Sequence, residues 1–193
     1  MSQGIKQFTL CVLIALSLFS VAASAEGIKL KTADLERVDN DWLLNATFKI
    51  ELTPGLEDAV QKGIVLYFQT EFELTRSRWY WFDEKPVLAR RLTRLSYQPM
   101  TQQYRIASEG FTFSAKTMFE ALQAVGSIGG WKVIDGNQVD PSKSYTAALR
   151  MTLDLSKLPK PFQVNALNNR EWNVSSDWFR FPLSPTGPSL IKR

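Results

Sequence analysis

The sequence predicts a mainly β protein, an antiparallel immunoglobulin-like β-sandwich with two short helices in its connections. Several segments alternate apolar and polar residues with the period of two that a half-buried strand requires. Turn residues separate these segments at frequent intervals, and no strand–helix–strand rhythm of a parallel sheet is present. We therefore expect six or seven strands in a single domain over residues 26–182.

The first 25 residues have the organisation of a secretory signal peptide. Lys6 precedes an apolar run from Phe8 to Val21, which is short for a membrane span, and Ala23-Ser24-Ala25 forms a small-residue cleavage site. We expect cleavage after Ala25 and export to the periplasm, the alternative being an uncleaved N-terminal anchor. Cys11 lies near the start of the apolar run, which disfavours a lipid anchor.

Composition excludes several chemistries from the mature chain. Removing 25 of the 193 residues leaves 168, enough for one domain with a substantial core and no need of a disulfide. The sequence has no histidine, and its one cysteine lies in the signal peptide. Zinc catalysis, thiol chemistry and serine–histidine hydrolysis are therefore excluded, and we expect no metal and no cofactor. Catalysis by carboxylates alone or by a lysine stays open.

The mature chain is expected to begin with a β-hairpin, followed by a short helix. Ile28–Val38 alternates imperfectly, which a bulge or an edge position would explain, and Asp39-Asn40-Asp41 predicts a turn. Trp42–Leu52 then alternates strictly, so we expect it to pair with the first strand. A short helix through Gln61 should follow, because Thr53 is a good N-cap and Pro54 suits the first helical position.

The next strand, Ile64–Thr75, has a pattern that inverts after Thr75, so that arginines take the apolar parity and tryptophans the polar one. A second helix is expected from a cap at Ser114 to Val125. Leu158–Pro161 should stop the strand Tyr145–Leu155. Residues 183–193 are expected to form a loose tail. The remaining strands are expected at Val87–Gln98, Gln102–Ala107, Trp131–Ile134, Tyr145–Leu155 and Trp172–Phe181, with a turn at Asp135–Asn137.

The segment after Thr75 carries the candidate binding residues. The mature net charge is only +3, because removal of Lys6 lowers the total of +4 by one, and this is too small to indicate nucleic acid. The segment from Arg76 to Arg105, however, contains seven basic residues and only two acidic ones. Guanidinium groups bind carboxylate or phosphate, and aromatic rings stack on sugars or cations. We expect one such surface from Arg76, Arg78, Trp79, Tyr80 and Trp81, joined by Arg90 and Arg91 from the neighbouring strand.

Four stretches resemble an uncharacterised family of exported proteobacterial proteins, often described only as proline-rich signal-peptide proteins. They are residues 72–84, 95–97, 101–105 and 153–161, and the likeness extends over essentially the whole mature chain. The resemblance implies an exported protein and supplies no catalytic residues. Members of that family often lie beside a sensor-kinase pair, which implies a link to envelope sensing.

Three functions follow from these observations. The first is a non-enzymatic envelope binding module, whose partner is an envelope protein or an anionic glycan or lipid headgroup. The second is a glycan-acting enzyme that uses carboxylates such as Asp83 and Glu84, although neighbouring residues in a strand or turn point apart. The third is a purely structural envelope protein, in which the tryptophans are buried and the arginines pair with Glu71, Glu73, Asp83 or Glu84.

Overall fold

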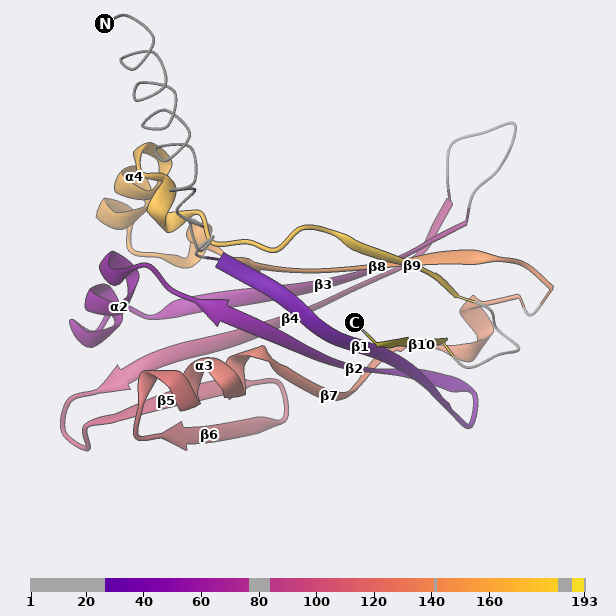
Figure 1. The fold of residues 1–193 in the computed structure, drawn as a ribbon, viewed down its shortest axis with the longest axis horizontal. Helices are drawn as coiled ribbons and strands as arrows, with labels where there is room; N and C mark the ends of the chain where they lie inside the picture. Colours follow the sequence, from indigo (N-terminus) through magenta and orange to yellow (C-terminus); the bar gives the residue numbers. More distant parts are fainter. Residues whose placement is uncertain (1–26, 77–83, 141, 184–188, 193) are drawn as a thin grey trace, which may run out of the picture.

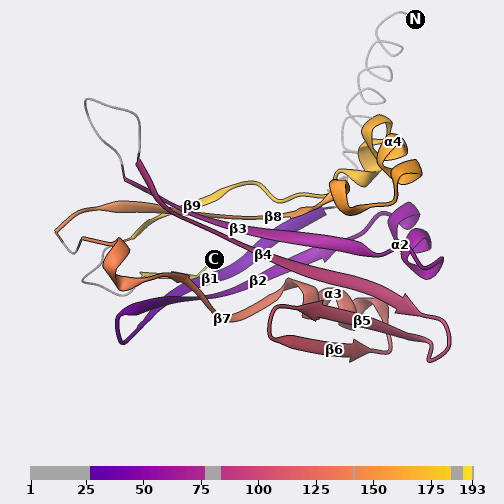
Figure 2. The same ribbon diagram turned by 180° about the vertical axis from the view of Figure 1, so that it is seen from behind.

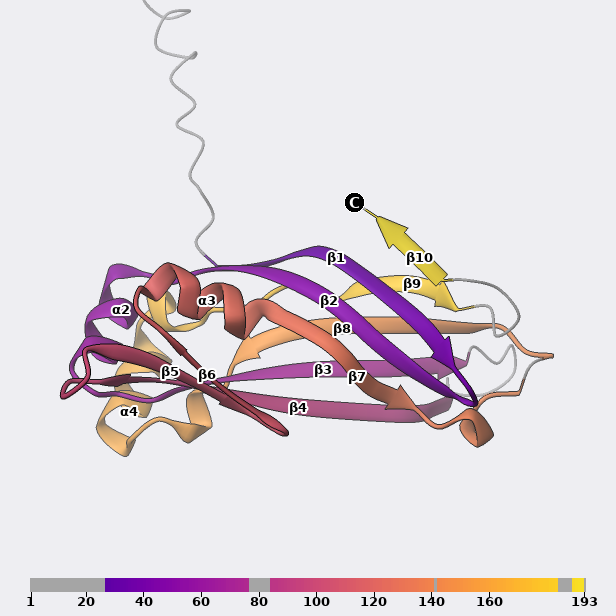
Figure 3. The same ribbon diagram turned by 90° about the horizontal axis from the view of Figure 1, so that it is seen from below.

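The computed structural model of this chain describes residues 27–76, 84–140, 142–183 and 189–192. The predicted signal peptide lies outside these residues. Within them, ten strands form two antiparallel sheets that lie as two layers (Figures 1 and 3). The four-stranded sheet has the order β10-β1-β2-β7, and the six-stranded sheet has the order β6-β5-β4-β3-β8-β9.

The bounds of the elements are as follows. The strands are β1 (Gly27–Val38), β2 (Asp41–Glu51), β3 (Leu66–Arg76), β4 (Glu84–Gln98), β5 (Gln103–Ser108), β6 (Phe111–Ala115), β7 (Ser127–Ile134), β8 (Tyr145–Leu153), β9 (Phe179–Leu183) and β10 (Ser189–Lys192). The helices are α2 (Pro54–Gln61), α3 (Met118–Gly126) and α4 (Lys160–Asn168), with 3-10 turns η1 (Gly136–Gln138), η2 (Leu155–Lys157) and η3 (Arg170–Trp172).

The predicted mainly β architecture is confirmed. Two antiparallel sheets bury a shared apolar core, as a β-sandwich does. The immunoglobulin-like layout is not confirmed, because the sheets have four and six strands where an immunoglobulin constant domain has four and three. Among the described residues, none of the helices combines the length and the apolar character needed to cross a bilayer.

The core comes from the strict alternation of the long strands. In β3 the side chains of one parity are fully buried, and in β2 every second residue is buried. β1 carries the predicted bulge, because its register with β2 shifts between Leu30 and Thr32. The bulge returns Ala33 and Leu35 to the buried face after the break in alternation. The largest fully buried side chains are Phe68, Phe72, Leu44, Leu56, Leu66, Leu74, Leu95, Ile106, Ile134, Leu149, Met151 and Leu183.

Helix α2 forms as predicted and covers one end of the sandwich. The hydroxyl of Thr53 accepts a hydrogen bond from the backbone N–H of Leu56, and Pro54 lies in the first turn. Gly63 follows the helix with a φ of +90°, a left-handed conformation that glycine adopts without strain. Figure 2 shows α2 and α4 at the same end of the molecule, where both contact η3.

Four local predictions differ from the structure. The second helix is capped by Thr117 rather than Ser114, because Ser114 belongs to β6, a strand that sequence patterns did not identify. The predicted stop at Leu158–Pro161 instead opens helix α4, in whose first turn Pro161 is tolerated. The last predicted strand, Trp172–Phe181, is replaced by β9, which begins only at Phe179 and runs on to Leu183, whereas the predicted turn at Asp135–Asn137 does form, as part of η1. Within the predicted tail, Ser189–Lys192 forms β10 and pairs with β1.

Candidate functional site

The structure describes three of the seven predicted site residues. Arg78, Trp79, Tyr80 and Trp81 lie outside the described residues, as does Asp83. Arg76 is the last residue of β3 and lies opposite Glu84 of β4 in the sheet register. Arg90 and Arg91 both lie in β4. The described part of the predicted surface thus consists of three arginines.

Arg90 and Arg91 do not share a surface. Consecutive residues of a strand point to opposite faces of the sheet. Arg90 lies opposite Glu71 in the register with β3, on the outer face of the six-stranded sheet. Arg91 lies opposite Thr70, which is buried on the inner face together with the core residue Phe72. The prediction that Arg90 and Arg91 contribute to one patch is therefore wrong.

On the outer face, Arg90 belongs to a cluster with Glu71, Arg150 and Trp178, which we call the Glu71 cluster. The Nε of Arg90 donates to Oε1 of Glu71 over 3.1 Å, and Nη2 of Arg150 donates to Oε2 of the same carboxylate. The guanidinium of Arg150 stacks on Trp178, with 4.4 Å from Cζ to the ring centroid. Glu71 is thus the shared acceptor of two cross-strand arginines.

The carboxylate of Glu71 is stabilised in its ionised form. Its side chain is only 8% exposed, and burial alone would raise its pKa. The hydrogen bonds and charges of Arg150 and Arg90 outweigh burial, so the pKa of Glu71 is lowered from its ordinary value of 4.5. Arg90 therefore pairs with an acid of its own sheet, as expected for an arginine with a structural role rather than a binding role.

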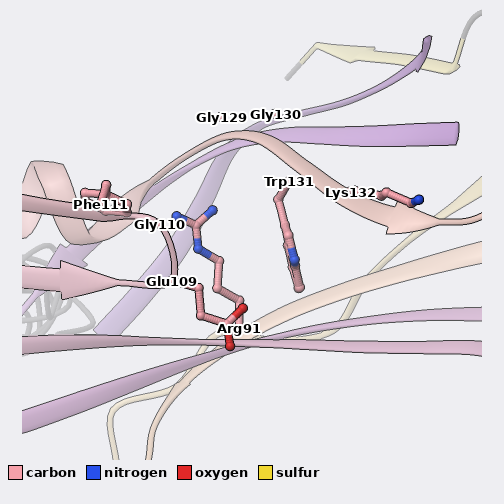
Figure 4. A pocket seen from close by; sticks show the side chains of 8 residues that line it. All are labelled: Arg91, Glu109, Gly110, Phe111, Gly129, Gly130, Trp131 and Lys132. Atoms are coloured by element: carbon pink, nitrogen blue, oxygen red, sulfur yellow. The ribbon is translucent and has the colours of Figure 1, made fainter. Parts of the chain in front are cut away.

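On the inner face, Arg91 lies in a cavity of about 330 Å³ at the edge of the sandwich. Figure 4 shows its guanidinium extending from β4 between Phe111 and Trp131 toward the glycines of β7. The lining residues are Arg91, Glu109, Gly110, Phe111, Gly129, Gly130, Trp131 and Lys132. We call this space the Arg91 cavity.

A β-bulge in β7 shapes the roof of the Arg91 cavity. In the register with β2, Leu44 lies opposite Trp131 and Ala46 opposite Ile128, so Gly129 and Gly130 together face the single residue Asn45. The side-chain oxygen of Asn45 accepts a hydrogen bond from the N–H of Gly130 over 2.8 Å. Gly130 has a φ of +58°, which glycine adopts without cost. The bulge fixes the two exposed glycines opposite the guanidinium.

Arg91 uses only part of its hydrogen-bonding capacity. The residue is 9% exposed, and its Nε donates to Oγ of Ser108 over 2.9 Å. Its Cζ lies 5.4 Å from the centroid of the Phe111 ring. Within the described part of the chain, Arg91 makes no ion pair and its two Nη atoms donate no hydrogen bond. A guanidinium has five donors, so most of its donors are free to bind a ligand.

The surrounding charges leave the positive charge of Arg91 largely unmatched. Burial lowers its pKa, and the carboxylate of Glu109, which is exposed, partly offsets this effect. Lys132 is neutralised by carboxylates outside the cavity, with 2.6 Å from its Nζ to Asp135 and 2.8 Å to Asp41. These two carboxylates raise the pKa of Lys132. Arg91 is thus the cation available to a ligand in the cavity.

Several residues around both sites were not identified from the sequence. Ser108, Phe111 and Trp178 have no role in the predicted site, and the predicted strand begins only at Trp131, after the Gly129-Gly130 pair. Paired glycines inside a strand do indicate a bulge, so that signal was available. Among the described residues, no group of three or more acidic, cysteine or histidine side chains could hold a metal ion.

Comparison with known proteins gives one match. The model of a domain of unknown function (DUF4390) matches residues 25–182, which is most of the chain. No curated protein matches the chain, and no solved structure does. The chain therefore belongs to the DUF4390 family, a family defined by a domain of unknown function.

Proposed function

We propose that this protein is a non-enzymatic binding module of the bacterial envelope and that the Arg91 cavity is its ligand site. The observation that supports this is an arginine that is nine-tenths buried as a whole residue, lines a cavity, and has Nη atoms that make no hydrogen bond within the described residues. Burial lowers the pKa of Arg91, and partial removal of this charge from water costs free energy unless a partner compensates it. A bound anion would compensate the positive charge of Arg91.

The ligand we propose is one carboxylated or phosphorylated sugar unit of an envelope glycan. Guanidinium binds either oxyanion through two parallel hydrogen bonds. The cavity of about 330 Å³ is at the small end for ligand sites, which suits a single sugar ring better than a long chain. Trp131 is half-buried in the lining and offers an aromatic face beside the guanidinium (Figure 4).

The proposal includes export of the protein to the periplasm. The signal peptide with cleavage after Ala25 and the resemblance to exported proteobacterial proteins support a periplasmic location, where such glycans occur. A role accessory to envelope sensing is compatible with a module that reports a ligand without transforming it. Export is tested by the N-terminal sequence of the protein recovered from the periplasm of an expressing cell, which should begin at Glu26.

Isothermal titration with glucuronic acid and glucose 1-phosphate tests the ligand site, and uncharged glucose serves as the ligand control. Both anions should bind the native protein, whereas glucose should not. Arg91→Gln should weaken binding about tenfold or more, because a charge-assisted hydrogen bond contributes about 1.5–3 kcal/mol. Arg90→Gln is the matched control, since it removes the same charge from the opposite face of the same strand. Equal binding by the two variants would exclude the Arg91 cavity.

A further inference from the structure

Three arginines on the outer face of the six-stranded sheet have no acidic partner within the described residues. In β3 and β8 the residues that alternate with the core face outward, and the register extends this assignment to the neighbouring strands. Arg94 of β4, Arg105 of β5 and Arg180 of β9 all occupy outward positions, and Arg105 and Arg180 are exposed. None of the three forms an ion pair with a described residue, and the buried Nε of Arg94 has no hydrogen-bond partner there. We call Arg94, Arg105 and Arg180 the unpaired arginines.

The unpaired arginines lie along a diagonal that crosses the sheet. The register of β4 with β5 makes Arg105 the diagonal neighbour of Arg94, at about 7–8 Å. Arg94 lies opposite Tyr67 of β3, whereas Arg180, on the far side of β3, is level with Glu73, six residues after Tyr67. With about 4.8 Å between strands and about 3.4 Å per residue, Arg94 and Arg180 are about 25 Å apart. A ligand that contacts both ends of this diagonal must therefore be a chain.

The Glu71 cluster lies between the two ends of the diagonal and leaves the face positively charged. Its two arginines, Arg90 and Arg150, share one carboxylate, so the cluster has one positive charge in excess. Glu73 follows Glu71 at the next outward position of β3. The unpaired arginines, the two arginines of the cluster and these two acids together have a net charge of +3. Because the like charges repel one another, a bound polyanion would stabilise this face.

The side chains between the arginines suit a carbohydrate chain. Gln69 and Thr152 lie opposite each other at outward positions, where an amide and a hydroxyl can bond sugar hydroxyls. Tyr67 lies at one end of the diagonal, and Trp178 of the Glu71 cluster lies toward the other. Figures 1 and 2 show α2 and α4 at one end of the sheet rather than along its length. Polar groups and rings among the cations favour a glycan over a lipid surface, which apolar side chains would enter.

We propose that the outer face of the six-stranded sheet binds a linear acidic polysaccharide. Arg94 and Arg105 hold carboxylates at one end of the bound segment, and Arg180 holds a carboxylate at the other end. Each guanidinium can bind a carboxylate through two parallel hydrogen bonds. The Glu71 cluster keeps its internal hydrogen bonds. This face is opposite to the one that carries Arg91, and the proposal does not depend on the sugar site proposed above.

Fluorescence anisotropy tests this proposal with the purified mature protein and a labelled polygalacturonate oligosaccharide that is long enough to span the diagonal. Binding should saturate and should weaken as salt is added, because salt screens exposed charges. A labelled dextran oligosaccharide of the same length is the ligand control and should not bind, since it carries no charge. Absence of binding by polygalacturonate would overturn the proposal.

Two double variants locate the site. Arg105→Gln with Arg180→Gln removes two exposed guanidinium groups and should weaken polygalacturonate binding about tenfold or more, because charge-assisted hydrogen bonds are lost at both ends. Lys29→Gln with Lys31→Gln is the matched control, since both lysines are exposed on β1 of the other sheet, and it should bind like the native protein. Equal weakening by the two double variants would show a general effect of net charge and would exclude this face.

Two further measurements test the recognition chemistry and the occupant. Arg94→Lys keeps the positive charge but loses the fork of parallel donors, so it should weaken polygalacturonate binding about threefold or more. Sedimentation with vesicles of phosphatidylglycerol and phosphatidylcholine tests a lipid surface as the occupant. Tighter binding to these vesicles than to polygalacturonate, abolished by Arg105→Gln with Arg180→Gln, would assign the face to a membrane and overturn the polysaccharide.

Discussion

Arg90 and Arg91 are consecutive residues of β4, and their guanidinium groups lie on opposite faces of the six-stranded sheet. Arg90 donates to the carboxylate of Glu71 on the outer face, whereas Arg91 lies against Phe111 on the inner face. The same side-chain chemistry thus has two different environments one residue apart. On the outer face the positive charge is matched by an acid, whereas on the inner face Arg91 has no ion-pair partner among the described residues.

Replacing Arg91 by methionine should stabilise the protein. Arg91 is 9% exposed and has no acidic partner within hydrogen-bond distance among the described residues, so its desolvation is poorly compensated. Exchange of a buried charge for an apolar side chain of similar length should raise the free energy of unfolding by about 1 kcal/mol, and Tm by about 2–4 °C. Thermal denaturation measures both. The gain should come with loss of sugar-anion binding, the trade-off that a binding residue implies.

Glu71→Gln should destabilise the protein, because it leaves two arginines without their shared carboxylate. We expect a loss of about 2 kcal/mol in urea unfolding. This is less than the roughly 3–5 kcal/mol that a fully buried pair costs, since the Arg90 side chain is 60% exposed and water screens it. Arg150→Ala should cost more than Arg90→Ala, as Arg150 is less exposed and also stacks on Trp178. A loss below about 0.5 kcal/mol for Glu71→Gln would show that the cluster is not a stabilising network.

The sequence predicts those parts of the fold that repeat a local pattern. The strict alternation of Trp42–Leu52 and of Tyr145–Leu155 identifies β2 and β8, because burial on one face enforces a period of two. β6 has no such pattern, since it is a five-residue edge strand with Phe113 exposed. α4 was missed because its prolines indicate a stop, while Pro161 lies in the first turn, where its missing N–H costs nothing.

The environment of Arg91 could not be predicted in the same way. Parity along β4 does place Arg90 and Arg91 on opposite faces, so this part of the predicted site could have been corrected from sequence alone. Ser108, Phe111 and Trp131, however, reach Arg91 only through the β4–β5–β6 pairings and the bulge in β7. Contacts between residues so far apart in the chain depend on register, and register is set by the packed sheets together.

The contribution of Glu71 to stability should disappear in acid. The pKa of Glu71 is lowered in the folded protein, so ionised Glu71 stabilises the fold above its ordinary value of 4.5. As pH falls below that value toward the lower folded pKa, the carboxylate takes up a proton and this stabilisation is lost. The difference in urea midpoint between the native protein and Glu71→Gln should therefore be constant from pH 7 to about pH 5 and shrink below it. A difference that is unchanged at about pH 3 would contradict this assignment.

Gly126→Ala should disrupt the junction at which α3 passes into β7. A Cβ atom at this position would lie 2.2 Å from the carbonyl oxygen of Phe48, and backbone rather than a flexible side chain would have to move. We expect a loss of about 2 kcal/mol, within the range of overpacking in a tight core. Gly129→Ala is the matched control, since nothing lies within 4 Å of its added Cβ and its φ is not in the left-handed region. If both variants unfold at the same urea concentration as the native protein, the close approach of α3 to β2 is wrong.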